Sequence, residues 1–393
     1  MSTVGIDFGT ATTAVAISNG AAGTRFVRDQ QGKEVIPSVL AFTPNQRTHA
    51  GFAAKARLLI DAPNTLHSFK RILGRTWSAP AVQRFRQQYP SLALEPDDRD
   101  LPRFATRAGK LSVTDVVAQF LATFRELEPL AQAPATRTTL SIPVSSGQAQ
   151  REALVEAATR AGFVNLALIE EPYAAALGHH GQLGAASKEQ IALVYDLGGG
   201  TFDTAVVAYH RKKIRLLALG GDPYLGGDDI DLVVAEWAAQ RILEEHRCDV
   251  RSDLSAWLGL VMACERAKIR LSEIEATTLD LSQIDPKLTG KDLRITRAQF
   301  VPLFSKLVRK TFIVCDDVLG KAGLVPSQID MLVLSGGCCH IPSIRSGVEH
   351  YVGRPDSAKI APDRLCAVGT LVHALEQERG GFQLAPIPAE AIA

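Results

Sequence analysis

The sequence predicts an α/β protein of two related lobes, each with a central sheet flanked by helices and an inserted small subdomain. Its 393 residues, 46% of them hydrophobic, are enough for two separate cores. One pattern occurs twice, about half a chain apart: an apolar strand ending in Asp, a glycine turn, a Thr and a second β-rich run. Strand-like and helix-like apolar runs follow both copies. The chain is therefore expected to contain a duplication.

The two copies are GIDFGT at residues 5–10 and VYDLGGGTFD at residues 194–203. Each is predicted to form a β-hairpin with a glycine-rich tip, where backbone N–H groups can converge on phosphate oxygens. Asp7 and Asp196 end the two strands and suit a hydrated Mg²⁺, which prefers one or two carboxylates with phosphates and water. Either copy alone could be an ordinary tight hairpin, but the matching Asp and Thr positions favour a nucleotide held between two lobes.

The first lobe is expected over residues 1–186, with an inserted subdomain at about 40–112 that is more polar and rich in proline. After the hairpin, its predicted strands and helices lie at 24–28, 35–42, 114–131, 138–144, 148–161, 166–169 and 173–177. Lys70 has apolar neighbours in the insert, so it can point into a cleft. Glu171, between a strand and a helix, is also expected to face a cleft. Ser145 or Ser146 would cap helix 148–161, and 179–187 would cross between the lobes.

The second lobe is expected over residues 187–380, with an inserted subdomain at about 228–297 and a tail or linker remnant at 381–393. Its predicted elements after the hairpin are strand 214–219, a glycine-rich turn at 220–229, helices over 230–243 and 253–272, a small sheet of 278–281 with 293–295, helix 296–322, strand 331–334 and helix 366–378. Asp228 and Thr296 are predicted helix caps. Gly336 and Gly337 form a third glycine tip.

Composition narrows the function classes. A net charge of +1 gives no footprint for nucleic acid or an anionic membrane, and neither a signal peptide nor a membrane-spanning apolar run is visible. The six cysteines lack metal-ligand or disulfide spacing, which fits a reducing, cytoplasmic setting. Motifs of P-loop NTPases, Rossmann proteins, serine hydrolases and zincins are absent.

The motifs in order resemble the nucleotide-binding domain of the DnaK-type seventy-kilodalton heat-shock chaperones over residues 4–378. They are the two hairpins, KRILGR at 70–75, IEEPYAAA at 169–176, LGGDDID at 225–231 and the glycine pair at 336–337. The resemblance implies the actin-like ATPase fold, ATP and ADP as ligands, and Mg²⁺ as cofactor. It also implies slow ATP hydrolysis within a chaperone that acts in protein folding.

The resemblance also implies site residues. Lys70 would neutralise charge near the γ-phosphate, and Glu171, Thr201 and Asp203 would orient the attacking water and accept its proton. Asp7 and Asp196 would hold the waters of Mg²⁺. The residues expected to bind the nucleotide are Gly9, Thr10, Ala11, Thr12, Gly198, Gly199, Gly200, Thr201, Gly226, Gly227, Glu265, Lys268, Ile269, Ser272, Gly336, Gly337, Cys338, His340 and Asp363.

Several positions depart from the family pattern. Ala11 removes a phosphate-loop hydroxyl, and Ile269 and His340 replace two arginines that would clamp the adenine, which predicts weaker or altered nucleotide affinity. Pro143 and Arg151 match the interdomain switch, whereas Ala167 and Glu170 replace the Arg and Asn of the J-domain docking surface. A J-domain protein, an exchange factor and a client are the possible protein partners. The family's leucine-rich linker and substrate-binding domain are not found at the end of this sequence.

Three functions are compatible with these residues. The first is a Mg²⁺-dependent ATPase that serves as the nucleotide-switched part of a chaperone. The second is a nucleotide-sensing module that binds ATP and leaves it intact. The third is an actin-like filament protein or a small-molecule kinase on the same fold.

Overall fold

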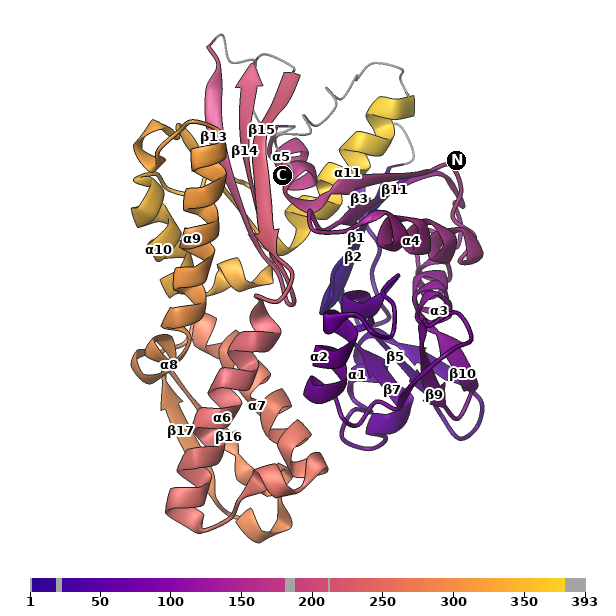
Figure 1. The fold of residues 1–393 in the computed structure, drawn as a ribbon, viewed down its shortest axis with the longest axis vertical. Coiled ribbons are helices and arrows are strands. Elements are labelled where there is room, and N and C mark those ends of the chain that lie inside the picture. Colours follow the sequence, from indigo (N-terminus) through magenta and orange to yellow (C-terminus); the bar gives the residue numbers. More distant parts are fainter. Residues whose placement is uncertain (1, 19–22, 181–187, 211–212, 379–393) are drawn as a thin grey trace.

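The computed structural model describes residues 2–18, 23–180, 188–210 and 213–378. It has two lobes side by side (Figure 1). The first contains a six-stranded sheet of order β12-β11-β1-β2-β3, with β4 also paired to β2. Its strands are β1 Ser2–Phe8, β2 Thr12–Ser18, β3 Thr24–Phe26, β4 Val35–Pro37, β11 Ala135–Ile142 and β12 Leu166–Glu170. The second contains a four-stranded sheet of order β15-β14-β13-β18, made of β13 Gln190–Leu197, β14 Phe202–His210, β15 Lys213–Asp222 and β18 Met331–Ser335.

The two sheets share one plan, which explains the duplicated motif. In each, an antiparallel hairpin (β1–β2 or β13–β14) has a parallel strand on the far side of its first member (β11 or β18). Parallel pairing requires a long crossover connection, which the intervening helices supply. The expected α/β class with a central sheet in each lobe is therefore confirmed.

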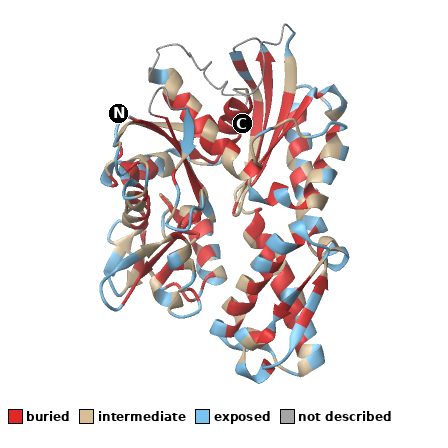
Figure 2. Ribbon diagram, turned by 180° about the vertical axis from the view of Figure 1, so that it is seen from behind, coloured by how far each residue is buried: buried red, intermediate tan, exposed pale blue. Residues whose placement is uncertain are grey.

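Helices cover the sheets. The first lobe carries α3 Val113–Arg125 and α4 Gln148–Arg160, and the second carries α9 Ser305–Lys321 and α10 Pro342–Val352. Two helices, α5 Glu171–His180 and α11 Pro362–Glu378, pack on each other between the lobes, α5 against β13 and β14 and α11 against β1 and β2. The buried residues form separate apolar clusters in the two lobes, and a third cluster lies around α5 (Figure 2).

Smaller sheets and helices follow in the two stretches predicted as inserts. The first stretch has the sheets β6-β5-β7 and β10-β9-β8, built from β5 Val39–Phe42, β6 Thr48–Ala50, β7 Thr65–His67, β8 Leu94–Pro96, β9 Pro102–Thr106 and β10 Gly109–Ser112, with helices α1 Gly51–Lys55 and α2 Pro80–Gln88. The second has α6 Gly227–His246, α7 Leu254–Glu273 and the hairpin β16 Ala276–Asp280 with β17 Asp292–Thr296. Both lie at the lower end of Figure 1, the first at the right and the second at the left.

Some local predictions were wrong. Neither Ser145 nor Ser146 caps α4; Gly147 is the N-cap, and its N–H donates to the Gln150 side chain at 2.9 Å. Asp228 lies inside the first turn of α6, and it is Asp229 that accepts from the N–H of the N-cap Gly226 at 3.0 Å. Glycine can occupy the N-cap in both helices because the side chain three residues later, Gln150 or Asp229, accepts from the backbone N–H of the N-cap.

Helix boundaries also differed. The helix predicted over 114–131 ends at Arg125. The one predicted over 296–322 is two helices, α8 Arg297–Leu303 and α9, which break at Phe304 just after Pro302. Thr296 does cap α8, accepting from the Gln299 N–H. The strand predicted over 214–219 extends to Asp222. Most of the predicted crossover at 179–187, and the tail at 381–393, lie outside the described residues.

Candidate functional site

The two hairpins place equivalent carboxylates at the ends of β1 and β13. The hydroxyl of Ser141, on β11, donates to Asp7 Oδ1 at 2.8 Å, and that of Ser335, on β18, donates to Asp196 Oδ2 at 3.0 Å. Each Asp thus has a serine donor on the parallel neighbouring strand. The repeat of the site extends beyond the hairpins, which the sequence analysis missed because these serines are far away in the chain.

The two hairpin tips touch each other. A Cβ added to Gly199 would lie 2.3 Å from the Ala11 Cβ, and one added to Gly200 would lie 2.6 Å from Thr10 Cγ2. Below them, a Cβ on Gly226 would lie 2.5 Å from the Gly199 carbonyl oxygen. Glycine is therefore required for the lobes to approach this closely.

A cavity of about 1910 Å³, counting its open mouth, lies between the lobes at these tips. Of the residues predicted to bind nucleotide or metal, all except Gly226 line it, and so does Glu171. Gly226 packs beneath the Gly199 tip instead. The lining residues that sequence reasoning did not assign to the site are Lys33, Val35, Asp228, Glu273, Ile341 and Arg364. Except for Asp228, which lies in the motif at 225–231, they belong to none of the quoted motifs.

Lys70 and Asp203 lie just behind the cavity wall. Lys70 lies in a 3₁₀ turn, Phe69–Ile72, and its Nζ is 2.6 Å from Glu171 Oε1 and also donates to the Phe8 carbonyl. Burial alone would lower the pKa of Lys70, but the carboxylates of Glu171 and Asp7 raise it above its ordinary value. The lysine is therefore a buried ammonium at the bottom of the cleft. Asp203 is 2% exposed and accepts from the Val144 N–H at 3.0 Å.

The bottom of the cleft has a surplus of acidic groups. Burial and the charge of Glu171 raise the pKa of Asp203 to about 8, and burial with the charges of Glu171 and Asp7 raises that of Asp196 well above its usual range. One ammonium, Lys70, faces these carboxylates, so a bound cation would relieve their repulsion. Within the described parts of the chain, no group of three or more His, Cys, Asp or Glu could hold a metal directly. The donors thus fit a hydrated Mg²⁺ held through its waters.

The far end of the cavity is formed by α7 and the third glycine tip. Lys268 Nζ is 2.7 Å from Asp231 Oδ2, and Glu265 Oε1 is 2.6 Å from Lys55 Nζ. Ile269 is 55% exposed, and His340 Nε2 lies 3.4 Å from Asp363 Oδ1. A flat ligand between Ile269 and His340 would find an apolar side chain and an imidazole, without a guanidinium from either position.

The neighbouring Cys338 and Cys339 are both buried free thiols. Cys338 Sγ is 3.3 Å from the Gly198 carbonyl oxygen and Cys339 Sγ is 2.9 Å from that of Ser335. Burial raises the pKa of the Cys338 thiol to about 12, so it remains protonated. Cys338 therefore packs the third tip against the second hairpin.

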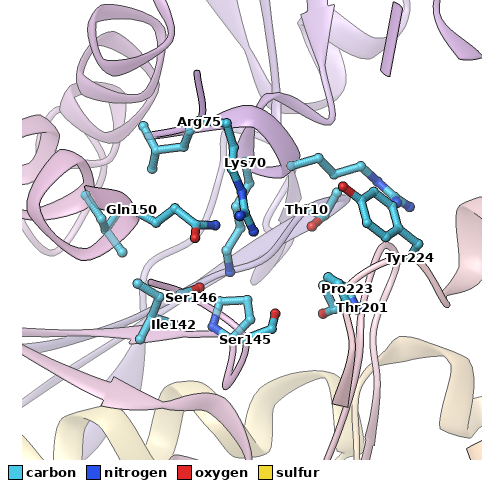
Figure 3. A pocket seen from close by; sticks show the side chains of 14 residues that line it. Thr10, Lys70, Arg75, Ile142, Ser145, Ser146, Gln150, Thr201, Pro223 and Tyr224 are labelled. Carbon is cyan, nitrogen blue, oxygen red and sulfur yellow. The ribbon is translucent and has the colours of Figure 1, made fainter. Parts of the chain in front are cut away.

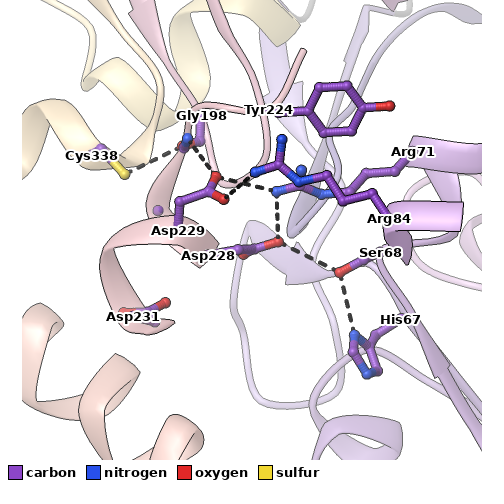
Figure 4. Close-up of polar contacts among 12 residues, drawn as sticks. His67, Ser68, Arg71, Arg84, Gly198, Tyr224, Asp228, Asp229, Asp231 and Cys338 are labelled. Carbon is purple, nitrogen blue, oxygen red and sulfur yellow. Dashed lines mark hydrogen bonds and ion pairs between the residues drawn. The ribbon is translucent and has the colours of Figure 1, made fainter. Parts of the chain in front are cut away.

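Polar contacts join the lobes across the cleft (Figure 4). Arg71 Nη2 lies 3.4 Å from Asp228 Oδ2 and 3.6 Å from Asp229 Oδ2. Arg84, on α2, lies 3.7 Å from Asp229 and stacks on Tyr224, 4.6 Å from its ring centroid. With the Lys55–Glu265 pair, these contacts hold the lobes in a closed arrangement.

The duplicated lobes and the glycine-tipped, acidic cleft between them define a protein of the actin-like ATPase class. A family model described as Hsp70 protein matches residues 3–378. The chain belongs to the Hsp70 family, as the sequence resemblance predicted.

Individual relatives agree. The chain is 30% identical over 377 residues to the chaperone protein DnaK of Stenotrophomonas maltophilia and 34% identical over 376 residues to the chaperone proteins HscA of Escherichia coli and Escherichia fergusonii. Each alignment covers 94% of this chain but only 57% to 58% of the relative. No helix in the described residues is long and apolar enough to cross a membrane.

Proposed function

We propose that the chain binds ATP between its lobes with Mg²⁺ and hydrolyses it slowly to ADP and phosphate. It would do so as the nucleotide-switched part of a cytoplasmic chaperone that acts in protein folding. The observation that carries the proposal is the buried Lys70–Glu171 pair beneath two touching glycine tips, with Asp7 and Asp196 on the cavity wall.

The proposed roles follow from these positions. The tips at Thr10 and Thr201 offer amides and hydroxyls to the phosphates, and Lys70 supplies a positive charge where the transferred phosphoryl group carries negative charge. Glu171 and Thr201 would orient the attacking water. Asp203, whose pKa is raised to about 8, would lie behind Thr201 and help to accept the proton of that water. Mg²⁺ would neutralise phosphate charge, with its waters on Asp7 and Asp196.

The domain limits are part of the proposal: lobe I over 1–186 with an insert at about 40–112, and lobe II over 187–380 with an insert at about 228–297. A J-domain protein, an exchange factor and a client are the proposed partners. Arg151 Nη2 lies 2.8 Å from Glu170 Oε1, so Glu170, which replaces the docking-surface Asn, pairs with the arginine that matches the interdomain switch. A J-domain partner that recognises the family's Arg and Asn would bind less well here, because Ala167 lacks a positive charge and Glu170 adds a negative one.

A single-turnover assay with protein in excess over ATP tests the activity. We expect conversion to ADP that requires Mg²⁺ and slows by at least about 100-fold in Thr201→Ala, because a water-orienting hydroxyl is lost. Thr278→Ala, at an exposed position on β16, is the matched control and should hydrolyse normally. Equal rates in Thr201→Ala and the parent protein would refute the assigned role.

The half-exposed Ile269 at the adenine end favours a second candidate, a module that binds ATP and leaves it intact. The same assay separates the two, since the sensor would retain labelled ATP unchanged through the whole time course.

A further inference from the structure

A second cavity, of about 520 Å³ counting its mouth, lies next to the nucleotide cavity. Two of its lining residues, Thr10 and Thr201, also line the larger cavity. Since these residues belong to the touching tips, the tips form part of the wall between the two spaces. The rest of its wall comes from the 3₁₀ turn at Lys70, the end of β11, the start of α4 and the turn between β15 and α6.

The wall of this second cavity is strongly basic. It includes Lys70, Arg71 and Arg75, and none of the residues that line it in the described chain is Asp or Glu. The other polar groups around it are hydroxyls and an amide, from Ser145, Ser146, Tyr224 and Gln150 among others. In Figure 3, the side chains of Lys70, Arg75 and Gln150 point toward the middle of the cavity. These groups can all donate hydrogen bonds, as an anion requires.

Both arginines of this cavity have buried N–H groups that lack a hydrogen-bond acceptor. Arg71 is 9% exposed, and although its Nη2 faces Asp228 and Asp229, its Nε and Nη1 have no hydrogen-bond partner. The buried Nε of Arg75 is also unpaired, and Arg75 forms no ion pair with any described residue. Leaving such donors unpaired is costly, so they indicate a missing acceptor. A guanidinium is well suited to a tetrahedral oxyanion, which it can bind through two parallel N–H groups.

We propose that this second cavity is a binding site for inorganic phosphate, separate from the nucleotide cavity. As the product of hydrolysis, phosphate would be formed on the other side of the threonine tips, and this part of the inference rests on the proposed function. The site requires only an anion small enough for the cavity and able to accept from Arg71, Arg75 and Gln150.

The test is a calorimetric titration of inorganic phosphate into the chain saturated with Mg²⁺ and ADP, which fill the larger cavity. Arg75→Gln removes one guanidinium. Gln150→Glu adds a negative charge to the wall, while its Oε1 can still accept from the Gly147 N–H and so preserve the start of α4. Arg86→Gln is the control, because Arg86 lies outside the cavity, over the Trp77 ring.

We expect both cavity variants to bind phosphate about tenfold or more weakly than the parent protein, and the control to bind it equally well. Absence of phosphate binding to the ADP-loaded parent, or equal binding by all variants, would overturn the proposal. Single-turnover cleavage of ATP, measured in the same proteins, should be unchanged in Arg75→Gln. If the parent binds phosphate with this variant pattern but cleaves no ATP, the site stands and the proposed hydrolysis fails.

Discussion

At the scale of single residues, the end of the cavity formed by α7 and the third glycine tip differs most from the family pattern. Ile269 and His340 offer dispersion and stacking to an adenine ring, but neither is a guanidinium. Because Ile269 is 55% exposed on α7, its side chain contributes little to the core. It can therefore be replaced without loss of the fold.

Replacing Ile269 should restore affinity. Ile269→Arg is expected to tighten ATP binding about two- to fivefold, because a stacked guanidinium contributes about 0.5–1 kcal/mol. Fluorescence titration with a labelled nucleotide measures the change. Ile313→Arg on α9, where Ile313 is 61% exposed, is the control and should leave affinity unchanged. Equal affinities for the parent and Ile269→Arg would show that no base lies beside this helix.

At the scale of elements, the crossing of α5 and α11 holds the two lobes together. A Cβ added to Gly369 on α11 would lie 1.6 Å from the Ala174 carbonyl oxygen, and one added to Gly178 on α5 would lie 2.5 Å from that of Leu365. The two helix backbones are thus in direct contact, and any side chain at either position would force them apart.

We therefore expect Gly369→Ala to destabilise the protein by about 3 kcal/mol or more, at or above the upper end for overpacked cores. Gly320→Ala, in α9, is the control: an added Cβ there meets nothing within 4 Å, so helix propensity predicts a gain of about 0.5–1 kcal/mol. Urea unfolding measures both. A neutral Gly369→Ala would contradict the close packing of the two helices.

The same region should make stability depend on pH. His179, on α5, is fully buried, with Nε2 3.0 Å from Ser357 Oγ and Nδ1 3.3 Å from Tyr209 Oη, and burial lowers its pKa from 6.5 to about 4. The unfolded chain binds a proton at His179 below pH 6.5, whereas the folded protein binds it only near pH 4. His179 thus contributes stability above pH 6.5 that is lost as pH falls toward 4.

Between pH 7.5 and 4.5, this loss should be about 2–3 kcal/mol. His179→Gln should be less stable at pH 7.5, but its stability should fall by correspondingly less over the same range. Unfolding in urea at both pH values gives the comparison, and the other histidines are present in both proteins. Parallel pH profiles would show that His179 titrates normally in the folded state.

Much of the fold and of the candidate site could be predicted from the sequence. The hairpins, Asp7 and Asp196 carry a local pattern, so the duplicated sheets and the hairpin part of the cavity wall followed from it. The α7 part of the wall, with Glu265 and Lys268, was predicted from the family resemblance.

By contrast, the second cavity depends on contacts between segments that are distant in the sequence. The N-caps Gly147 and Gly226 were missed although their partners, Gln150 and Asp229, are only three residues away, because glycine has no side chain to indicate a cap. Asp203 was predicted at the site but lies behind the wall, where its carboxylate accepts from the N–H of Val144, a residue distant in the sequence.

At the scale of the whole molecule, the closed arrangement of the lobes should control how fast nucleotide leaves. The ion pair between Lys55 on α1 and Glu265 on α7 joins the two lobes at the far end of the cavity, with both side chains about one quarter exposed. Opening the cleft breaks this pair. Because solvent screens a partly exposed ion pair, we expect this pair to stabilise the closed state only modestly.

Lys55→Met should speed nucleotide release by about two- to fivefold, since a partly exposed pair contributes about 0.5–1 kcal/mol. Stopped-flow displacement of a fluorescent nucleotide measures the rate, and added salt should reduce the difference between parent and variant. Lys321→Met, which removes an exposed pair within α9, should not alter release. An unchanged rate in Lys55→Met would mean that this pair does not limit opening.

The central claim is that the two lobes close on a metal-bound triphosphate. Its most direct test is anomalous diffraction from crystals grown with Mn²⁺ and a non-hydrolysable ATP analogue. The account predicts a single strong Mn²⁺ peak between the carboxylates of Asp7 and Asp196, with water between the ion and each carboxylate, and a triphosphate against the tips at Thr10 and Thr201. Mn²⁺ and triphosphate bound elsewhere, with the space between these two aspartates empty, would contradict it.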